Sequence, residues 1–225
     1  MWSNNTITRR GSLITRGRED LNVVIVEPPA KTCNCFRLTK KLTCDPPSVS
    51  IDQRFRLLPH YSGVCCSYDL TTRDLTGSVR LYGMAHSGDD YLYSTGRGYV
   101  DLAADETGVW VIYAAAGDHS HMLVARLDTE MMSVTGTWSI AVRHADYGNG
   151  FVVCGVLYLV HDETARHGAA LDFAYDLHDR RHVEVHPDVT FTSPYQLTTA
   201  LAYNARDQRL YAWDNGNQLT YPLLV

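Results

Sequence analysis

From about residue 49 to its end, the chain alternates short apolar stretches with tight polar or glycine-containing turns. One arrangement, an apolar strand, a turn and an aromatic-rich strand, occurs at residues 101–113, 150–160 and 201–213. Aligned on Trp110, Tyr158 and Tyr211, the copies recur after 48 and then 53 residues. All-strand repeats of about 40 to 50 residues are typical of propeller blades with four strands each. The pattern therefore predicts an all-β propeller.

A second, shorter element follows each copy downstream, at residues 125–128, 174–177 and 219–222. An earlier version at residues 67–70 has no clear first half. We interpret residues 129–133 as a turn between blade strands rather than a helix. Blades of about 48 residues after position 48 amount to roughly three and a half, and a closed ring needs at least four. Either the first 48 residues supply the missing strands, or the chain is an incomplete copy of a larger ring, which we favour.

Residues 1–48 do not share the repeat. One apolar burst at 21–29 ends in prolines, so we expect at most one strand there and irregular structure elsewhere. Basic residues are richest before Lys41, and we interpret them as a solvated arm. A formal net charge of −5 without a long basic run argues against nucleic-acid binding. The sequence shows no apolar run long enough for a membrane span and no secretory signal at Met1.

The composition is that of one ordinary soluble domain, 45% hydrophobic and 20% charged, and its 14 tyrosines favour strands. Six cysteines are too few and too unevenly placed for a disulfide scaffold. Cys33 and Cys35 lack the two-residue spacing of a zinc knuckle. Cys65 and Cys66 are predicted to face opposite sides of one strand.

The repeats resemble the olfactomedin domain of olfactomedins, myocilin, gliomedin and latrophilins. Three passages carry the resemblance, residues 101–114, 148–158 and 202–216. It extends back to about Val49, which divides the chain into a non-matching segment, 1–48, and a partial domain, 49–225. The tail of the chain looks most similar to gliomedin. The resemblance implies a five-bladed propeller, here with an incomplete first blade, in a secreted or cell-surface protein.

The same resemblance implies a disulfide. In the family, a cysteine that opens the domain pairs with the one that matches Cys154. That opening stretch has no counterpart in residues 1–48, so the partner of Cys154 stays open, with Cys33, Cys35 and Cys44 as substitutes.

A calcium ion in the central channel, often with sodium beside it, is also implied. Carried over by position, Asp101 supplies a carboxylate, Asn149 an amide oxygen, and Gly150 and Leu201 backbone carbonyls. Ala202 stands where the family has its second carboxylate. Calcium needs six to eight oxygens and its affinity depends on ligand charge, so sodium or water are alternative occupants. In the plainer alternative, backbone amides or water satisfy Asp101.

Other polar clusters receive structural interpretations. Asp105 and Glu106 lie in a turn and are not expected to form a catalytic pair. The set His178, His182 and His186 is read as a solvated hairpin loop rather than a metal site. Two further patterns give only weak hypotheses: a zinc site at His119 and His121, and glycosylation at Asn4.

The leading hypothesis is a non-enzymatic module that binds extracellular or cell-surface proteins. Exposed loops at 118–121, 161–168 and 178–187 are the candidate binding surfaces, because loops carry recognition on propellers. A second hypothesis makes Asp101 the acid or base of a propeller enzyme, which requires a second titratable group beside it. A third is a truncated product without activity, kept open by the mismatch of residues 1–48.

Overall fold

The computed structural model describes residues 55–60, 63–69, 71–161, 171–185 and 193–223, with residues 55–60 described by their backbone alone. These parts are all β apart from one 3-10 turn, η1 (His144–Asp146). The strands are β1 (Phe55–His60), β2 (Val64–Asp69), β3 (Leu75–Arg80), β4 (Val100–Asp105), β5 (Gly108–Ala115), β6 (Asp118–Asp128), β7 (Ser133–Ala141), β8 (Tyr147–Val153), β9 (Val156–His161), β10 (Leu171–Asp176), β11 (Arg181–Val183), β12 (Thr198–Asn204), β13 (Arg209–Asp214) and β14 (Asn217–Pro222). Within this part of the chain there is no helix long and apolar enough to span a bilayer.

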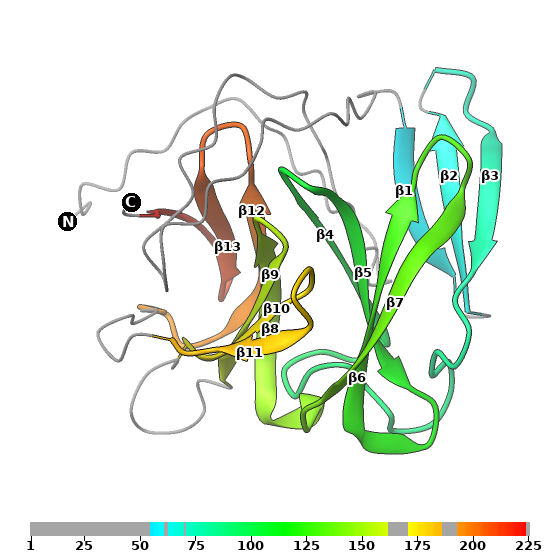
Figure 1. Cartoon of the computed structure of the whole chain (residues 1–225). Coiled ribbons are helices and arrows are strands. Elements are labelled where there is room, and N and C mark those ends of the chain that lie inside the picture. The colour runs from blue at the N-terminus through cyan, green and yellow to red at the C-terminus, as the bar shows by residue number, and fades with distance from the viewer. Residues whose placement is uncertain (1–54, 61–62, 70, 162–170, 186–192, 224–225) are drawn as a thin grey trace.

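The strands form four antiparallel sheets in which each strand pairs with its neighbour in sequence (Figure 1). The first sheet is β1–β2–β3, the second β4–β7, the third β8–β11 and the fourth β12–β13–β14. The predicted all-β propeller architecture is confirmed, and each of the three repeated passages is a strand–turn–strand unit. The described residues thus form two four-stranded sheets and two three-stranded sheets, where a propeller blade has four strands. The five-bladed ring stays a prediction.

Aspartates at strand ends explain the second repeated element. Asp128 ends β6 and Asp176 ends β10, and Oδ1 of each accepts hydrogen bonds from two backbone N–H groups of the following turn, all at 2.9 Å. At the end of β2, Asp69 Oδ1 accepts the N–H groups of Thr71 at 2.6 Å and Thr72 at 3.2 Å. Such side-chain bonds favour a turn over a longer strand. Strands β2 and β3 therefore correspond to the third and fourth strands of a blade.

A bulge in the next strand supports this correspondence. The pairing register shifts beside Ser67 in the first sheet and beside Arg126 in the second. At both places a threonine hydroxyl donates to the opposite carbonyl at 3.3 Å, Thr76 to Ser67 and Thr135 to Arg126. The first sheet thus contains the second, third and fourth strands of a blade, and its innermost strand is absent among the described residues. The missing strand explains why the sequence before residues 67–70 shows no clear strand–turn–strand copy of the repeat.

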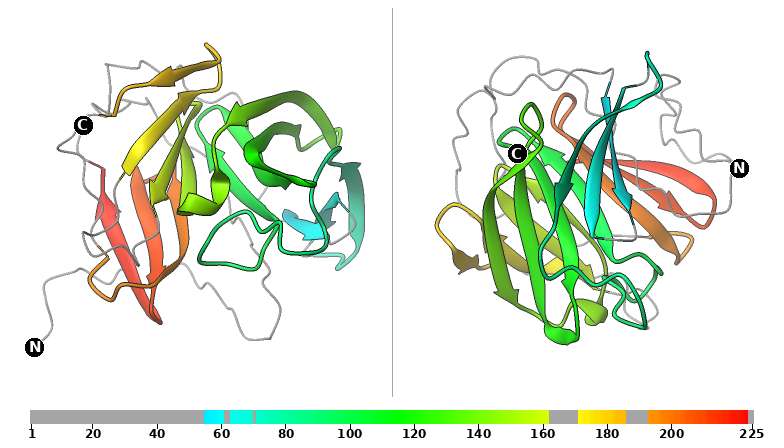
Figure 2. Two further views of the ribbon diagram at one scale, coloured as in Figure 1. Left: turned by 90° about the horizontal axis from the view of Figure 1, so that it is seen from below. Right: turned by 90° about the vertical axis from the view of Figure 1, so that its right-hand side faces the viewer.

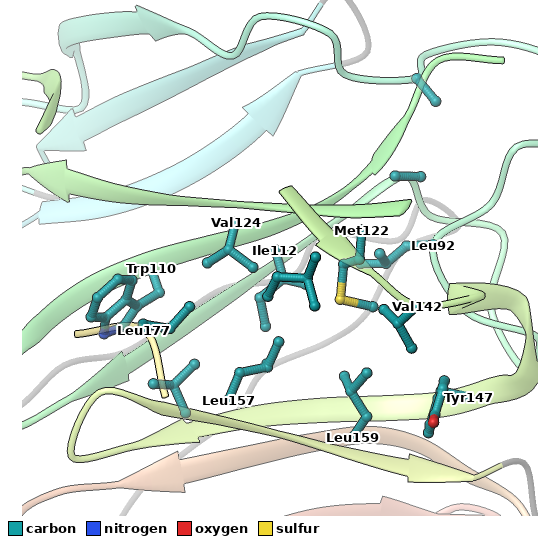
Figure 3. Close-up of a cluster of buried hydrophobic side chains, with 14 residues drawn as sticks. Leu92, Trp110, Ile112, Met122, Val124, Val142, Tyr147, Leu157, Leu159 and Leu177 are labelled. Atoms are coloured by element: carbon teal, nitrogen blue, oxygen red, sulfur yellow. The ribbon is translucent and has the colours of Figure 1, made fainter. Parts of the chain in front are cut away.

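Apolar side chains fill the spaces between adjoining sheets. Because the second and third sheets are covered on both faces, every residue of β5 and β8 is buried. Trp110 and Ile112 of β5 point toward the third sheet and meet Leu157 and Leu159 of β9, whereas Val111 packs toward the first sheet (Figure 3). Close packing on both faces fixes the orientation of each sheet relative to the next.

Asp105, in the turn between β4 and β5, is buried and fully bonded. Its Oδ1 accepts the N–H groups of Thr107 at 2.9 Å and Gly108 at 3.1 Å, and the indole N–H of Trp110 at 3.0 Å. Its Oδ2 accepts the N–H of Gly155 in the third sheet at 2.5 Å. The predicted turn is confirmed, but this side chain also joins two sheets.

Glu106 extends the connection to the fourth sheet. It is 4% exposed. Its Oε2 accepts the N–H of Cys154 at 3.3 Å, and its Oε1 accepts the hydroxyl of Tyr203 at 2.5 Å. A buried carboxylate without donors would be costly, whereas here both oxygens have one. The two acidic residues, which the sequence placed only in a turn, therefore link three sheets.

We predict that Glu106→Gln lowers the free energy of unfolding by about 1 to 3 kcal/mol, because an amide N–H₂ group replaces one acceptor in a buried site. Urea denaturation followed by circular dichroism measures the change. Glu130→Gln, on the exposed turn after β6, is the matched control and should change stability by less than about 0.5 kcal/mol. Equal stability of Glu106→Gln and wild type would contradict a structural role for this contact.

Candidate functional site

The four residues predicted to bind a cation lie on the innermost strands. Asp101 is on β4, Asn149 and Gly150 are on β8, and Leu201 is on β12. These three strands contact one another, although they begin far apart in the sequence. The fold therefore brings together the strands that carry all four residues.

Asp101 is a half-buried residue whose carboxyl group has an unusual acidity. Burial raises its pKa to about 7, although hydrogen bonds from the Tyr93 hydroxyl and from the backbone of Leu102 act in the opposite direction. The Tyr93 hydroxyl donates to Oδ2 at 3.2 Å. Near neutral pH the side chain consequently exists in both charged and uncharged forms.

Tyr93 is the site residue that sequence reasoning missed. It comes from residues 81–99, which connect β3 to β4. Its neighbours hold this segment to the start of β8, because the Ser94 N–H donates to the carbonyl of Tyr147 at 2.9 Å and the Thr95 hydroxyl to that of Gly148 at 2.7 Å. Burial and the nearby Asp101 charge raise the pKa of Tyr93 well above its usual value. No repeat or motif marks it, because the segment lies outside the repeated strands.

Gly150, which has no side chain, leaves room for the Tyr93 hydroxyl. A Cβ atom at this position would lie 2.8 Å from Tyr93 Oη and 2.9 Å from Leu159 Cδ2. Both distances are shorter than Cβ contacts in proteins, so a larger residue here would displace Tyr93 and Leu159. The backbone role that the resemblance implied for Gly150 is thus joined by a steric one.

Asn149 and Leu201 face different surroundings. Asn149 is buried, and its Nδ2 donates to the carbonyl of Thr198 on β12 at 2.7 Å, which leaves its Oδ1 as an acceptor. The Leu201 side chain is buried in the apolar cluster between the third and fourth sheets, so only its backbone is suited to a ligand. Ala202, the next residue, is exposed.

Asp101, Asn149, Gly150 and Leu201 would all offer oxygen atoms as metal ligands. The carboxylate of Asp101 is the one negative charge among them. Hard cations prefer such donors, and a low ligand charge gives weak binding. Among the described residues, no three or more His, Cys, Asp or Glu side chains are grouped closely enough to hold a metal. The same pair, a carboxyl group with a pKa near 7 beside a phenol, is also suited to exchanging a proton.

The histidines between β10 and β11 do not converge. The described part of this segment is a hairpin, as predicted. The ring of His178 lies 6.3 Å from that of Trp110, while His182 packs edge-on against Phe173 and Tyr175. His186 lies outside the described residues.

His119 and His121 contact separate carboxylates. His119 Nε2 lies 3.1 Å from Asp90 Oδ1, and His121 Nδ1 lies 2.9 Å from Asp118 Oδ2. The zinc hypothesis gains no third ligand from the part of the chain that the structure describes.

Cys65 and Cys66 alternate across β2, as predicted, with Cys65 buried and Cys66 half-buried. Burial raises the pKa of the Cys65 thiol to about 12, so it is a poor nucleophile. These two are the free cysteines of the described residues, and Cys154, buried in the turn after β8, is not among them. Asn4 and the three amino-terminal cysteines lie outside the described residues.

Comparison with known proteins assigns the family. Residues 59–225 match the model of the olfactomedin-like domain. Over 162 residues the chain is 35% identical to human adhesion G protein-coupled receptor L1, an alignment that covers 69% of this chain and 11% of the receptor. Over 158 residues it is 32% identical to myocilin of Rattus norvegicus, with 69% of this chain and 30% of myocilin covered. The chain thus spans about a tenth of the receptor and less than a third of that myocilin, and it belongs to the olfactomedin-domain family.

Proposed function

We propose that this chain is a binding module that contacts other proteins outside the cell, in adhesion, matrix contact or cell-surface signalling. The observation that carries the proposal is the match of residues 59–225 to the olfactomedin-like domain, together with 35% identity to a receptor named for adhesion. Stacked sheets with both faces covered provide a rigid support for recognition by surface loops.

Residues 118–121, predicted from the sequence to form a binding loop, are instead the first residues of β6, and their own contacts hold this strand end in shape. Asp118 Oδ1 accepts the N–H of Ser120 at 2.8 Å and its hydroxyl at 2.6 Å. Hydrogen bonds from the Ser120 hydroxyl and N–H lower the pKa of Asp118 to about 2, so it is charged at neutral pH. A surface segment that is ordered before binding loses less entropy when a partner docks.

For the innermost site we propose a weakly held hard cation. Asp101, the Oδ1 of Asn149 and the backbone carbonyls of Gly150 and Leu201 would hold it. Because Ala202 supplies no second carboxylate, the site suits sodium better than calcium. A cation there would favour the charged form of Asp101 and lower its raised pKa.

A second candidate function is acid–base catalysis at the same site. Asp101, with its pKa of about 7, and Tyr93 at 3.2 Å form the titratable pair that such an enzyme requires. We favour binding, because the relatives' names include an adhesion receptor and no enzyme.

We further propose that Cys154 forms a disulfide with Cys33, Cys35 or Cys44. Cys154 is buried and is not a free cysteine, whereas Cys65 and Cys66 are free. The remaining cysteines of the sequence all lie in the first 44 residues.

The binding role predicts saturable attachment of the labelled chain to a panel of adherent cells, measured by flow cytometry. Treating the cells with trypsin should abolish attachment, because the partner is a protein. Enzymatic removal of surface glycans alone should leave it. Absence of saturable binding, or turnover in a broad hydrolase screen that Asp101→Asn abolishes, would contradict the proposal.

The cation site predicts a small calcium-dependent rise in melting temperature at pH 8, relative to chelator, by preferential binding to the folded state. The rise should shrink at pH 5, where Asp101 is protonated, and vanish in Asp101→Asn. Ala202→Asp should enlarge it by restoring a carboxylate. Sodium titrated in chelator should also raise the melting temperature, and no response of wild type or Ala202→Asp to either ion would contradict the site.

In chelator, Asp101 should also make stability depend on pH. Its folded pKa of about 7 exceeds the unfolded value of about 3.9, so its contribution is fully present below about pH 4 and is lost as pH rises through 7. This part of the pH profile should be missing in Asp101→Asn.

The disulfide predicts that tryptic peptides of the non-reduced chain include one that joins Cys154 to the amino-terminal segment, detected by mass spectrometry. Cys65 and Cys66 should be alkylated under denaturing conditions without reductant and serve as the internal control. Alkylation of Cys154 under the same conditions would disprove the pairing.

A further inference from the structure

An open pocket lies between the outer strands of the first and second sheets. Strands β3 and β7 contact each other, and the pocket beside them has a volume of about 440 Å³. Figure 2 (right) views this side of the molecule, with the first sheet in front of the viewer and the second sheet beside it. The lining includes Val79, Arg80, Tyr82, Met132, Val134 and the buried Tyr113.

The internal repeat allows this contact between the first and second sheets to be compared with the equivalent contact between the second and third sheets. The matching bulges align Gly77 with Gly136, and therefore Val79 of β3 with Trp138 of β7. In β7 the indole of Trp138 folds over Gly136, where a Cβ atom would lie 2.7 Å from the ring. Arg180, from the turn of the third sheet, lies 5.4 Å above that ring. An aromatic ring beneath a cation thus occupies the outer contact between the second and third sheets.

The contact between the first and second sheets lacks that ring. Val79 stands at the indole's position, and Met132 covers Gly77, where a Cβ would lie 2.6 Å from Met132 Cγ. Valine is much smaller than tryptophan and leaves the adjoining space open. The pocket is therefore a specific departure from the repeat, at a position where the next sheet carries a partly buried aromatic ring.

Exposed apolar residues and one arginine lie in or next to the elements that line the pocket. Tyr82, two residues after β3, lines the pocket and is 81% exposed, and Leu75, the first residue of β3, is 64% exposed. Met131, beside Met132, is 76% exposed. Arg80 is the one charged side chain in the lining, and no ion pair joins it to another described residue. Exposed apolar residues beside a free cation are typical of a protein-binding surface.

The edge of β3 offers main-chain groups as well. The Leu81 N–H donates to the carbonyl of Gly63 at 2.7 Å, which makes that pair a hydrogen-bonded one. Bonded and non-bonded pairs alternate along an antiparallel ladder, so Ser78 and Arg80 direct their N–H and C=O groups away from β2. An extended chain can pair with such an edge.

We propose that this groove binds an extended acidic segment of a partner protein. An aromatic side chain of the segment enters the pocket beside Val79, in the manner of Trp138, and a neighbouring carboxylate pairs with Arg80. Charge argues against the chain's own amino-terminal segment as the occupant, because residues 1–41 contain eight basic and three acidic residues. The inference rests on the proposed binding function and specifies one surface and one partner chemistry for it.

The test uses the whole chain, ¹⁵N-labelled, and two synthetic peptides, acetyl-Asp-Trp-Asp-amide and its charge-reversed counterpart acetyl-Lys-Trp-Lys-amide. Titration followed by NMR should show shifts at the groove residues with the acidic peptide and at least tenfold weaker binding of the basic one. Val79→Trp should weaken the acidic peptide at least tenfold, because the chain's own indole takes the space. Arg80→Glu should reverse the preference, whereas Arg97→Glu, an exposed arginine outside the groove, should not.

Three results would overturn the groove proposal: equal affinity for both peptides, wild-type affinity in both Val79→Trp and Arg80→Glu, or tighter binding of a synthetic peptide of residues 1–41. Arg80→Glu changes an exposed side chain, so it keeps the test valid if Val79→Trp misfolds. The peptide titrations need no cells, so they judge the groove separately from cell attachment. Attachment of wild type and Arg80→Glu to cells with equal affinity would overturn the groove while leaving the binding function intact.

Discussion

The arrangement of the innermost strands depends on two adjacent buried carboxylates. Asp105 and Glu106 are neighbours at one turn; both side chains accept hydrogen bonds from the third sheet, and Glu106 accepts one from the fourth as well, so three sheets meet at one point. In a site of low dielectric such bonds are strong when every oxygen has a donor and costly when one is lost. Apolar packing holds neighbouring sheets in pairs, whereas this network ties three together. The positions of β4, β8 and β12 follow from it.

The properties of the candidate cation site depend on the close approach of β4, β8 and β12. Burial of the Asp101 carboxyl group raises its pKa, and the absence of a side chain at Gly150 leaves space for the Tyr93 hydroxyl that donates to it. A second carboxylate at the position of Ala202 would add charge repulsion unless a cation offset it. The single carboxylate is therefore compatible both with a weakly bound cation and with none.

Because the sheets repeat one another, a residue that differs at an equivalent position is informative. Equivalent turns, bulges and threonine hydrogen bonds recur between sheets, and against this regular background Val79 in place of an indole stands out. Fold alone does not specify function, which resides in such local differences. The outer groove and the innermost site lie on different strands, so a partner and a cation need not compete.

The sequence by itself determined the all-β architecture, because strand periodicity and turn chemistry are local properties. The spacing of Trp110, Tyr158 and Tyr211 marked the strand pairs, and the aspartates of the second element marked the turns. It also indicated Asp101 and Asn149 by resemblance. Only the tertiary structure decided the roles of Tyr93 and Glu106, because Tyr93 lies in a connection outside the repeated strands and the partners of Glu106 lie on two other sheets. Their contacts join residues 8 and 97 positions apart, and no repeat or turn pattern in the sequence encodes either contact.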